Sequence, residues 1–271
     1  MKNGKWDARI SRAAQLASVH PTAAEGLRFY ERIAQVQRSL YADFESECGV
    51  TPEPRAPGTL RAELDLFVLL PRFSPFLSLI EQHAPGPLAQ AAARLRASGG
   101  TRWQEALLEF WRGEKVASAG LESAEALISW IFLQPYAEYL ADYTLHPPIH
   151  GTPLVCPFCS SIPQVGVLRP EGDGGKRSLV CSLCSQEWNF RRLICASCGE
   201  EDVNKLAVFS TPQLPYIRVE ACDTCHRYIK TVDMTKDGHA VPVVDELATI
   251  PLNLWAAEHG YTKLHSNLLG I

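Results

Sequence analysis

The chain carries four Cys-x-x-Cys pairs, and these decide its fold: Cys156-Pro-Phe-Cys159, Cys181-Ser-Leu-Cys184, Cys195-Ala-Ser-Cys198 and Cys222-Asp-Thr-Cys225. The first two pairs are separated by 21 residues and the last two by 23, whereas only ten residues separate Cys184 from Cys195. An aromatic residue follows each second pair, Trp188 in one case and Tyr228 in the other. The repeated spacing predicts an internal duplication of one small module.

Each Cys-x-x-Cys turn aims two thiolates at one point, and a hairpin can return a second turn to complete a tetrahedron of sulfurs. The sequence therefore predicts two metal sites with eight ligands: Cys156, Cys159, Cys181, Cys184, Cys195, Cys198, Cys222 and Cys225. Sequential pairing, first with second and third with fourth, is the simplest arrangement, and a cross-braced one stays open. Redox dithiols of the thioredoxin type are the alternative, but they begin a helix in a βαβ unit, which these loops do not resemble.

The ligand set by itself does not choose the metal, because four thiolates suit zinc and iron equally. It does restrict the chemistry. A closed tetrahedron leaves no position for water or substrate, so metal-centred hydrolysis is not expected, whereas iron could still pass one electron. His226 and Cys48 receive no ligand role, since the pairs already complete both sets.

The residues before the first pair have a helical pattern. Apolar residues recur every three or four positions from Thr22 to Cys48, Thr22 and Glu25 fit a capping box, and Gly49 fits a helix end. Proline and glycine punctuation separates the further helices that we predict, at 60–70, 76–82, 88–97, 102–111 and 123–143. Their apolar faces are typical of a helix-bundle core.

The pattern changes after the segment His146-Pro-Pro-Ile-His-Gly-Thr-Pro153, which cannot continue a helix and is expected to be a linker. Strands at 164–168 and 177–180 predict a hairpin, and a last helix should start near Pro251. We expect an α+β chain with five segments: an extension (1–20), a helical domain (21–148), two tetracysteine metal modules (149–192 and 193–238) and a C-terminal helix with its tail (239–271).

Composition narrows the function classes. Hydrophobic residues make up 46% and charged residues 21%, as in globular proteins, and the net charge of -4 disfavours nucleic-acid binding. No secretory signal is recognised at the start, and Pro71, Arg72 and Pro75 interrupt the most apolar stretch, 64–80. We expect a cytoplasmic protein without a membrane span. No catalytic motif appears, and Gly172-Asp-Gly-Gly-Lys176 fails as a phosphate loop, so we expect no enzyme.

Five stretches together resemble FdhE, the formate dehydrogenase accessory protein. They span residues 156 to 261: Cys156-Pro-Phe-Cys159, Cys181-Ser-Leu-Cys-Ser-Gln-Glu-Trp188, Arg218-Val-Glu-Ala-Cys-Asp-Thr-Cys-His-Arg-Tyr-Ile-Lys230, Asp245-Glu-Leu-Ala-Thr249 and Glu258-His-Gly-Tyr261. The combination is far more specific than cysteine pairs alone. The helical half is compatible with the family in length and type.

The resemblance implies a cytoplasmic maturation factor that binds the catalytic subunit of a molybdenum or tungsten formate dehydrogenase. It also implies rubredoxin-like or zinc-ribbon-like modules with two metal ions, iron being favoured and zinc the alternative, and the eight paired cysteines as functional residues. A rubredoxin-like electron carrier and a zinc-ribbon nucleic-acid binder are the alternative functions. The chain departs from the usual knuckle, in which glycine follows the second cysteine: only Gly199 conforms, while Ser160, Ser185 and His226 occupy positions of strained backbone.

Overall fold

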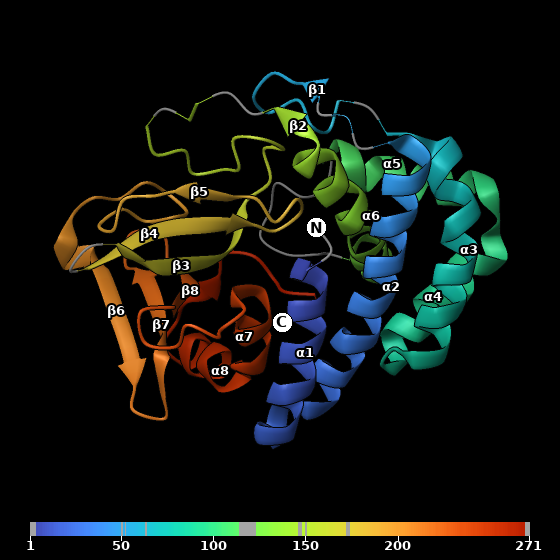
Figure 1. Ribbon diagram of the computed structural model, residues 1–271. Helices are drawn as coiled ribbons and strands as arrows, with labels where there is room; N and C mark the ends of the chain where they lie inside the picture. The colour runs from blue at the N-terminus through green and yellow to red at the C-terminus, as the bar shows by residue number, and fades with distance from the viewer. Residues whose placement is uncertain are drawn as a thin grey trace.

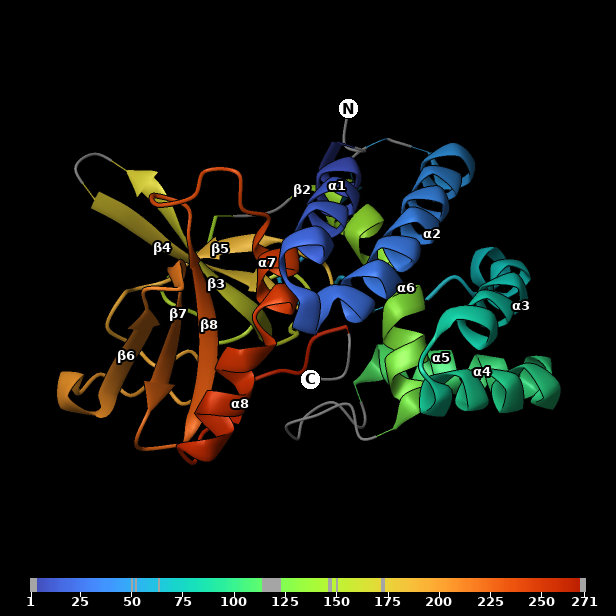
Figure 2. The same cartoon turned by 90° about the horizontal axis from the view of Figure 1, so that it is seen from below.

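The computed structural model describes residues 4–49, 51, 53–62, 64–113, 123–145, 148–149, 151–171 and 174–268. A helical half and a β half lie side by side, and α7 (Pro242–Ala248) lies between the sheet and α1 (Gly4–Val19) (Figures 1 and 2). The predicted α+β class, with a helical region followed by two tetracysteine modules and a C-terminal helix, is confirmed. The five segment boundaries drawn from the sequence stay a prediction.

The helical half is built around one buried helix. It comprises α1, α2 (Ala24–Cys48), α3 (Leu66–His83), α4 (Gly86–Ser98), α5 (Gly100–Arg112) and α6 (Ala124–Asp142). Every residue of α6 from Ile128 to Tyr139 is buried, and the helix contacts α2, α3, α4 and α5. Its Phe132 ring packs against Phe73 and Phe76 of α3. This burial explains why α6 lacks the one-sided apolar stripe of a surface helix.

Three local predictions in this half are wrong. Residues 4–19 form α1, although no helix was predicted before Pro21. The capping box at Thr22 and Glu25 does not form, because a 3-10 turn covers Pro21–Ala23 and α2 starts from Ala23 without a side-chain cap. The two helices expected at 60–70 and 76–82 are one helix, α3.

The single helix α3 has a clear beginning and a continuous apolar face. The Asp65 side chain accepts hydrogen bonds from the Phe67 and Val68 amides, which places the start six residues later than predicted. Two prolines lie inside the helix, yet its buried side chains continue through both of them: Leu69, Phe73, Phe76, Leu77 and Ile80. Packing of this face outweighs the backbone hydrogen bonds that the prolines remove.

The β half is one sheet rather than two separate modules. Its strands are β3 (Pro163–Glu171), β4 (Gly174–Cys181), β5 (Glu187–Asn189), β6 (Leu206–Thr211), β7 (Leu214–Cys222), β8 (Arg227–Asp233) and β9 (Thr262–Lys263). The order is β5-β4-β3-β8-β7-β6, with β9 beside β8. The predicted hairpin is the antiparallel pair β3 and β4. A small parallel pair, β1 (Glu53–Pro54) with β2 (Thr144–Leu145), stands apart.

A parallel pairing of β3 with β8 joins the two modules, and a glycine makes it possible. Gly166 on β3 lies opposite Thr231 on β8. A Cβ atom at Gly166 would lie 2.2 Å from the Thr231 hydroxyl oxygen, closer than any side chain permits. Glycine is therefore required where the sheets of the two modules meet.

Two short helices cover the sheet face that looks toward the helical half. These are α7 (Pro242–Ala248), which was not predicted, and α8 (Ile250–Glu258), which matches the helix expected from Pro251. Asp245 of α7 receives hydrogen bonds from the Arg12 guanidinium at 2.6 to 3.2 Å, so α7 ties α1 to the sheet. No helix in the described part of the chain has the length and apolar character of a membrane span.

A buried ion pair fixes α7 on the sheet. The Lys230 ammonium of β8 lies 2.8 Å from a Glu246 carboxylate oxygen and donates hydrogen bonds to the Glu246 carbonyl and to Thr249. Lys263 approaches the same carboxylate at 2.5 Å. Lys230, Glu246 and Thr249 belong to the stretches that resemble FdhE. Some residues of those stretches therefore serve to hold the fold together rather than to bind metal.

We expect stability to fall with acid through Glu246. Burial alone would raise its pKa, but the ammonium groups of Lys230 and Lys263 lower it to about 2. Since the unfolded carboxyl titrates at an ordinary pKa of about 4.3, this stabilisation is complete above that pH and is lost as the pH falls toward 2. The loss amounts to about 3 kcal/mol at most, at ~1.4 kcal/mol per pKa unit.

Urea unfolding of the wild type and of Glu246→Gln between pH 6 and the acid limit checks this expectation. Acid also releases metal from thiolates in both proteins, so the difference between the two curves is the quantity to read. The two free energies of unfolding should converge as the pH falls. Parallel curves would show that Glu246 does not carry the effect.

Candidate metal centres

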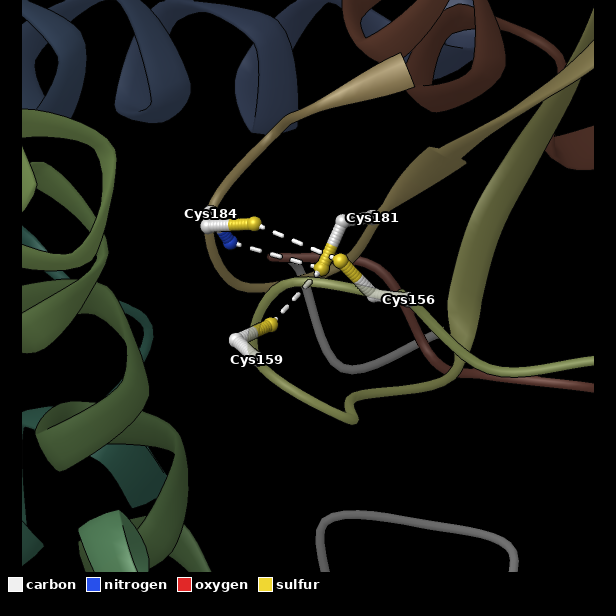
Figure 3. Close-up of side chains that lie close together, drawn as sticks. All are labelled: Cys156, Cys159, Cys181 and Cys184. Atoms are coloured by element: carbon white, nitrogen blue, oxygen red, sulfur yellow. Dashed lines mark hydrogen bonds between the residues drawn. The ribbon is translucent and has the colours of Figure 1, made fainter. Parts of the chain in front are cut away.

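The first cysteine cluster lies where the β3–β4 hairpin meets the helical half (Figure 3). Cys156 and Cys159 lie in the turn before β3, and Cys181 and Cys184 lie in the turn at the end of β4. The sulfur atoms of Cys159 and Cys181 are 3.3 Å apart, and those of Cys156 and Cys184 are 3.6 Å apart. The pairing is sequential, as the simplest interpretation of the sequence predicted.

The second cluster repeats this arrangement in the β6–β7–β8 module. Cys195 and Cys198 precede β6, Cys222 is the last residue of β7, and Cys225 lies in the turn between β7 and β8. The sulfurs of Cys195 and Cys225, and those of Cys198 and Cys222, are both 3.8 Å apart.

Both clusters have the dimensions of a metal site. The edge of a sulfur tetrahedron around an ion with metal–sulfur bonds of about 2.3 Å is about 3.8 Å long. All four ligand atoms of each cluster lie within 4.8 Å of one another. Each cluster therefore fits one tetrahedrally bound ion, and the geometry suits zinc and iron alike.

Four similar backbone turns hold the sulfurs. Two kinds of backbone hydrogen bond close these turns, with N···O distances of 2.8 to 3.1 Å. In one, the amide four residues after the first cysteine donates to the carbonyl of that cysteine. In the other, the amide of the first cysteine donates to the carbonyl five residues later. The donor and acceptor pairs are Ser160 to Cys156, Gly199 to Cys195, His226 to Cys222, Cys156 to Ser161, Cys181 to Gln186 and Cys195 to Glu200. Amides inside the turns also point at sulfur: those of Leu183 and Cys184 lie 3.4 Å from the Cys181 sulfur.

The residue after each second cysteine adopts left-handed backbone. Its φ angle is 61° at Ser160, 54° at Ser185, 53° at His226 and 78° at Gly199. A side chain in this conformation is strained by about 1 to 2 kcal/mol relative to glycine. The sequence expectation that these positions need a special backbone is confirmed, and three of the four turns form without glycine.

Exchanging the residue types at this position should change stability in opposite directions. Ser160→Gly should raise the free energy of unfolding by up to about 1 kcal/mol, because strain is relieved while the unfolded chain gains freedom. Gly199→Ser should lower it by about 1 to 2 kcal/mol. A Cβ at Gly199 meets only the Leu154 side chain, at an ordinary 3.7 Å, so crowding does not add to the strain. Thermal unfolding at constant metal content measures both changes. If both substitutions stabilised the protein, or both destabilised it, backbone strain would not be the cause.

The two clusters differ in their exposure. All four cysteines of the first are buried. In the second, Cys195 and Cys222 are buried, but Cys225 is half-buried and Cys198 is exposed. The first site is thus sealed inside the protein, and the second is open to solvent on one side.

Charge within the first cluster is unevenly distributed among the thiols. Hydrogen bonds from Cys156, Cys181 and Cys184 lower the pKa of Cys159, whereas burial raises the pKa of Cys181 and of Cys184. Four thiolates cannot share this buried space by themselves. A bound cation supplies the positive charge that lets all four ionise, which is why such sites bind metal with release of protons.

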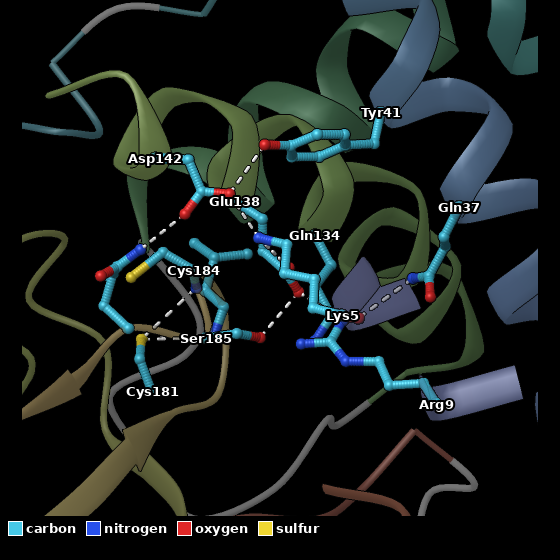
Figure 4. A network of polar contacts seen from close by, with 12 residues as sticks. Lys5, Arg9, Gln37, Tyr41, Gln134, Glu138, Asp142, Cys181, Cys184 and Ser185 are labelled. Carbon is cyan, nitrogen blue, oxygen red and sulfur yellow. Dashed lines mark hydrogen bonds and ion pairs between the residues drawn. The ribbon is translucent and has the colours of Figure 1, made fainter. Parts of the chain in front are cut away.

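One face of α6 binds the second turn of the first cluster (Figure 4). Its polar residues are spaced four apart and contact three residues of that turn. The Gln134 amide donates to the Ser182 carbonyl at 3.3 Å, Glu138 accepts from the Ser185 hydroxyl at 2.7 Å, and Asp142 accepts from the Gln186 amide at 3.1 Å. The Trp130 indole also donates to the Ser182 carbonyl, at 3.0 Å.

Glu138 is fully buried and is held by cations from α1. The Arg9 guanidinium lies 2.7 Å and the Lys5 ammonium 2.9 Å from its two carboxylate oxygens. Burial would raise the pKa of Glu138, but Arg9 and Lys5 outweigh it and keep the pKa below its ordinary value. One carboxylate therefore links α1, α6 and a metal-binding turn.

The first turn of the same cluster is held by the segment before α3. The Gly58 amide donates to the Pro157 carbonyl at 2.8 Å, and the Leu60 amide donates to the Phe158 carbonyl at 3.2 Å. Both turns of the first cluster are therefore bonded to the helical half.

Sequence reasoning missed these supporting residues. A signal was present, because Gln134, Glu138 and Asp142 repeat every four residues inside an otherwise apolar helix. Basic residues near the cysteine pairs are held by partners other than sulfur: Lys230 pairs with Glu246, Arg191 with Glu201 and Arg218 with Glu220, and Arg192 donates to the Gly175 carbonyl.

The remaining candidates have no place in the clusters. Cys48 is exposed and lies outside both cysteine clusters, and His226 is not part of either ligand set. His146 and His150, which belong to the linker expected from the sequence, lie outside the described residues.

Comparison with known proteins agrees with this architecture. Residues 155–192 match the central domain of FdhE and residues 193–269 match its C-terminal domain. A "Protein FdhE homolog" from Aquifex aeolicus is 27% identical over 96% of this chain and 94% of its own, and one from Pseudomonas aeruginosa is 29% identical over 96% and 88%. The crystal structure of the FdhE protein from Pseudomonas aeruginosa superposes with a TM-score of 0.71 at 25% identity, over 98% of this chain and 96% of that one. Residues 155–269 therefore match the central and C-terminal domains of FdhE, and the whole chain is similar to FdhE proteins in sequence and fold.

Proposed function

We propose that this protein is a non-enzymatic accessory factor that binds the catalytic subunit of a formate dehydrogenase in the cytoplasm and promotes its maturation. The observation that carries the proposal is the pair of closed four-sulfur clusters in a chain similar to FdhE proteins. Four thiolates complete a tetrahedron, so a bound ion keeps no position for water or substrate. The clusters can therefore stabilise a surface that binds a partner or carry an electron, but they cannot activate water for hydrolysis.

Iron is the metal we favour, with zinc as the alternative. The four cysteines of each cluster would hold either ion, and iron would add the capacity to accept and return one electron. The first cluster is enclosed by α6 and the segment before α3, which suits a structural ion. The exposed residue Cys198 places the second cluster at the protein surface.

That exposure also favours a second candidate function, a rubredoxin-like electron carrier. This alternative requires iron and predicts a coloured protein whose visible absorption bleaches on reduction. A colourless protein with zinc in both sites would exclude the carrier function and leave the accessory function intact.

Partner capture tests the proposal directly. Immobilised protein, purified with its metals, should retain the catalytic subunit of formate dehydrogenase from a lysate of cells that synthesise the enzyme. Cys198→Ser and Cys225→Ser alter the second cluster, and Cys48→Ser is the matched control because Cys48 lies outside both clusters. Failure to retain the subunit, together with normal formate dehydrogenase activity in cells that lack this protein, would refute the accessory function.

A further inference from the structure

The two edges of the sheet are built differently. The edge strand β5 has three residues, and its Glu187 is held by Arg169 at 2.6 Å. The opposite edge strand, β6, is the six-residue run Leu206-Ala-Val-Phe-Ser-Thr211, which has no charge and no proline. Among the described strands only β7 pairs with β6. Short, charged edges resist association with other chains, so β5 is protected and β6 is open to a further strand.

The open edge lies on the side of the sheet away from the helical half (Figures 1 and 2). Phe209 points to the covered face, where its ring packs 4.6 Å from that of Trp255. Val208 and Ser210 occupy the other face of the strand and are exposed, and 56% of Val208 is accessible to solvent. Leu193, in the segment that leads to the second cluster, is 57% exposed.

A positively charged cleft adjoins this edge. It has a volume of about 330 Å³, and its lining includes Arg177, Arg192, Leu193, Val208 and Arg218. Three guanidinium groups face two carboxylates there, those of Glu220 and Asp233.

The carboxylates leave part of this positive charge uncompensated. Glu220 lies 2.5 Å from Arg177 and 3.6 Å from Arg218, so one negative charge serves two cations. The Nε atoms of Arg177 and Arg218 have no hydrogen-bond partner among the described residues. Asp233 accepts hydrogen bonds from the amide and hydroxyl of Thr235.

We propose that β6 and this cleft bind an extended segment of the partner, which adds a strand along β6 and carries an apolar and an acidic residue two positions apart. The partner's identity rests on the function proposed above. Side chains two residues apart in a strand lie on the same face. The apolar one packs against Val208 and Leu193, and the acidic one passes the small Ser210 to reach Arg218, which lies directly opposite Ser210 on β7.

The test uses the full-length metal-loaded protein and synthetic 12-residue segments that tile the catalytic subunit, with binding measured by fluorescence anisotropy. Val208→Lys should weaken binding of the responsive segment at least about tenfold, because a charged side chain on an edge strand opposes pairing. Arg218→Ala should weaken it only while the segment keeps its acidic residue. Val19→Lys is the matched control, since Val19 is 61% exposed at the end of α1, far from this edge in the fold.

Hydrogen exchange adds an independent measure on the whole catalytic subunit. The amides of residues 206–211 should exchange more slowly when the subunit is bound. If the subunit binds but Val208→Lys is harmless and these amides are not protected, the docking site is refuted while the accessory function stands. Concentration-dependent self-association that Val208→Lys abolishes, without binding of any segment, would assign the edge to a second copy of this chain and also refute the proposal. If the protein fails to bind the subunit and cells that lack it keep normal formate dehydrogenase activity, the accessory function is refuted, and binding of the segments decides the docking site separately.

Discussion

Cys181→Ser is expected to abolish cooperative folding of the whole protein, whereas Cys198→Ser is expected to remove one metal ion and leave the fold in place. Cys181 is a buried ligand of the first cluster, which α6 and the segment before α3 enclose. Without the first ion its buried thiols lose the cation that lets them ionise together inside the protein, and the binding free energy of an enclosed ion is folding free energy. Loss of the first ion also loosens the turn to which α6 is hydrogen-bonded.

Cys198 is exposed, and the turn that supplies Cys222 and Cys225 is bonded to the C-terminal segment, where the Tyr261 hydroxyl donates to Asp223 and the Thr262 amide to the His226 carbonyl. We expect Cys198→Ser to lower the free energy of unfolding by an amount within the common range of about 0.5 to 3 kcal/mol. Metal analysis, circular dichroism and urea unfolding measure the two effects. Cys48→Ser is the control and should change stability by less than about 0.5 kcal/mol. If Cys181→Ser and Cys198→Ser lowered the free energy of unfolding equally, the two clusters would contribute equally to stability, and this prediction would be wrong.

Glu138→Ala should cost about 3 to 5 kcal/mol, the second largest effect we expect. The substitution leaves the Arg9 guanidinium, whose side chain is 7% exposed, buried without its carboxylate. It also removes the acceptor for the Ser185 hydroxyl in the turn beside Cys184. The metal-binding turn should therefore loosen, and the first ion should be lost to a chelator faster than in the wild type.

Two further variants separate the charge from the general loss of a side chain. Glu138→Gln keeps an acceptor for Ser185 and should lie between the wild type and Glu138→Ala. Asp7→Asn disrupts the exposed pair of Asp7 with Arg38, in which the two side chains are 58% and 45% exposed, and should change stability by less than about 1 kcal/mol. A similar small effect of Glu138→Ala would contradict the proposed role of this carboxylate.

The sequence by itself determined the parts of the protein that depend on neighbouring residues. Each Cys-x-x-Cys turn closes within a few residues, so spacing predicted the two clusters and made sequential pairing the simplest arrangement, while a cross-braced one stayed open. The left-handed position after each second cysteine is equally local. Helices such as α2 and the β3–β4 hairpin followed from apolar periodicity, which reports one buried face.

Only the tertiary structure decided how these parts are combined. Arg9 and Glu138 are 129 residues apart in the chain, and Arg12 and Asp245 are 233 apart. Arg9 and Arg12 make residues 1–20 look like a polar extension in the sequence. Charged side chains are seldom buried without a partner, and the partners of these two lie far away in the chain. The joining of both modules into one sheet rests on the parallel contact of β3 with β8, which no local pattern encodes. The same long-range contacts seal the first metal site and leave the second one open.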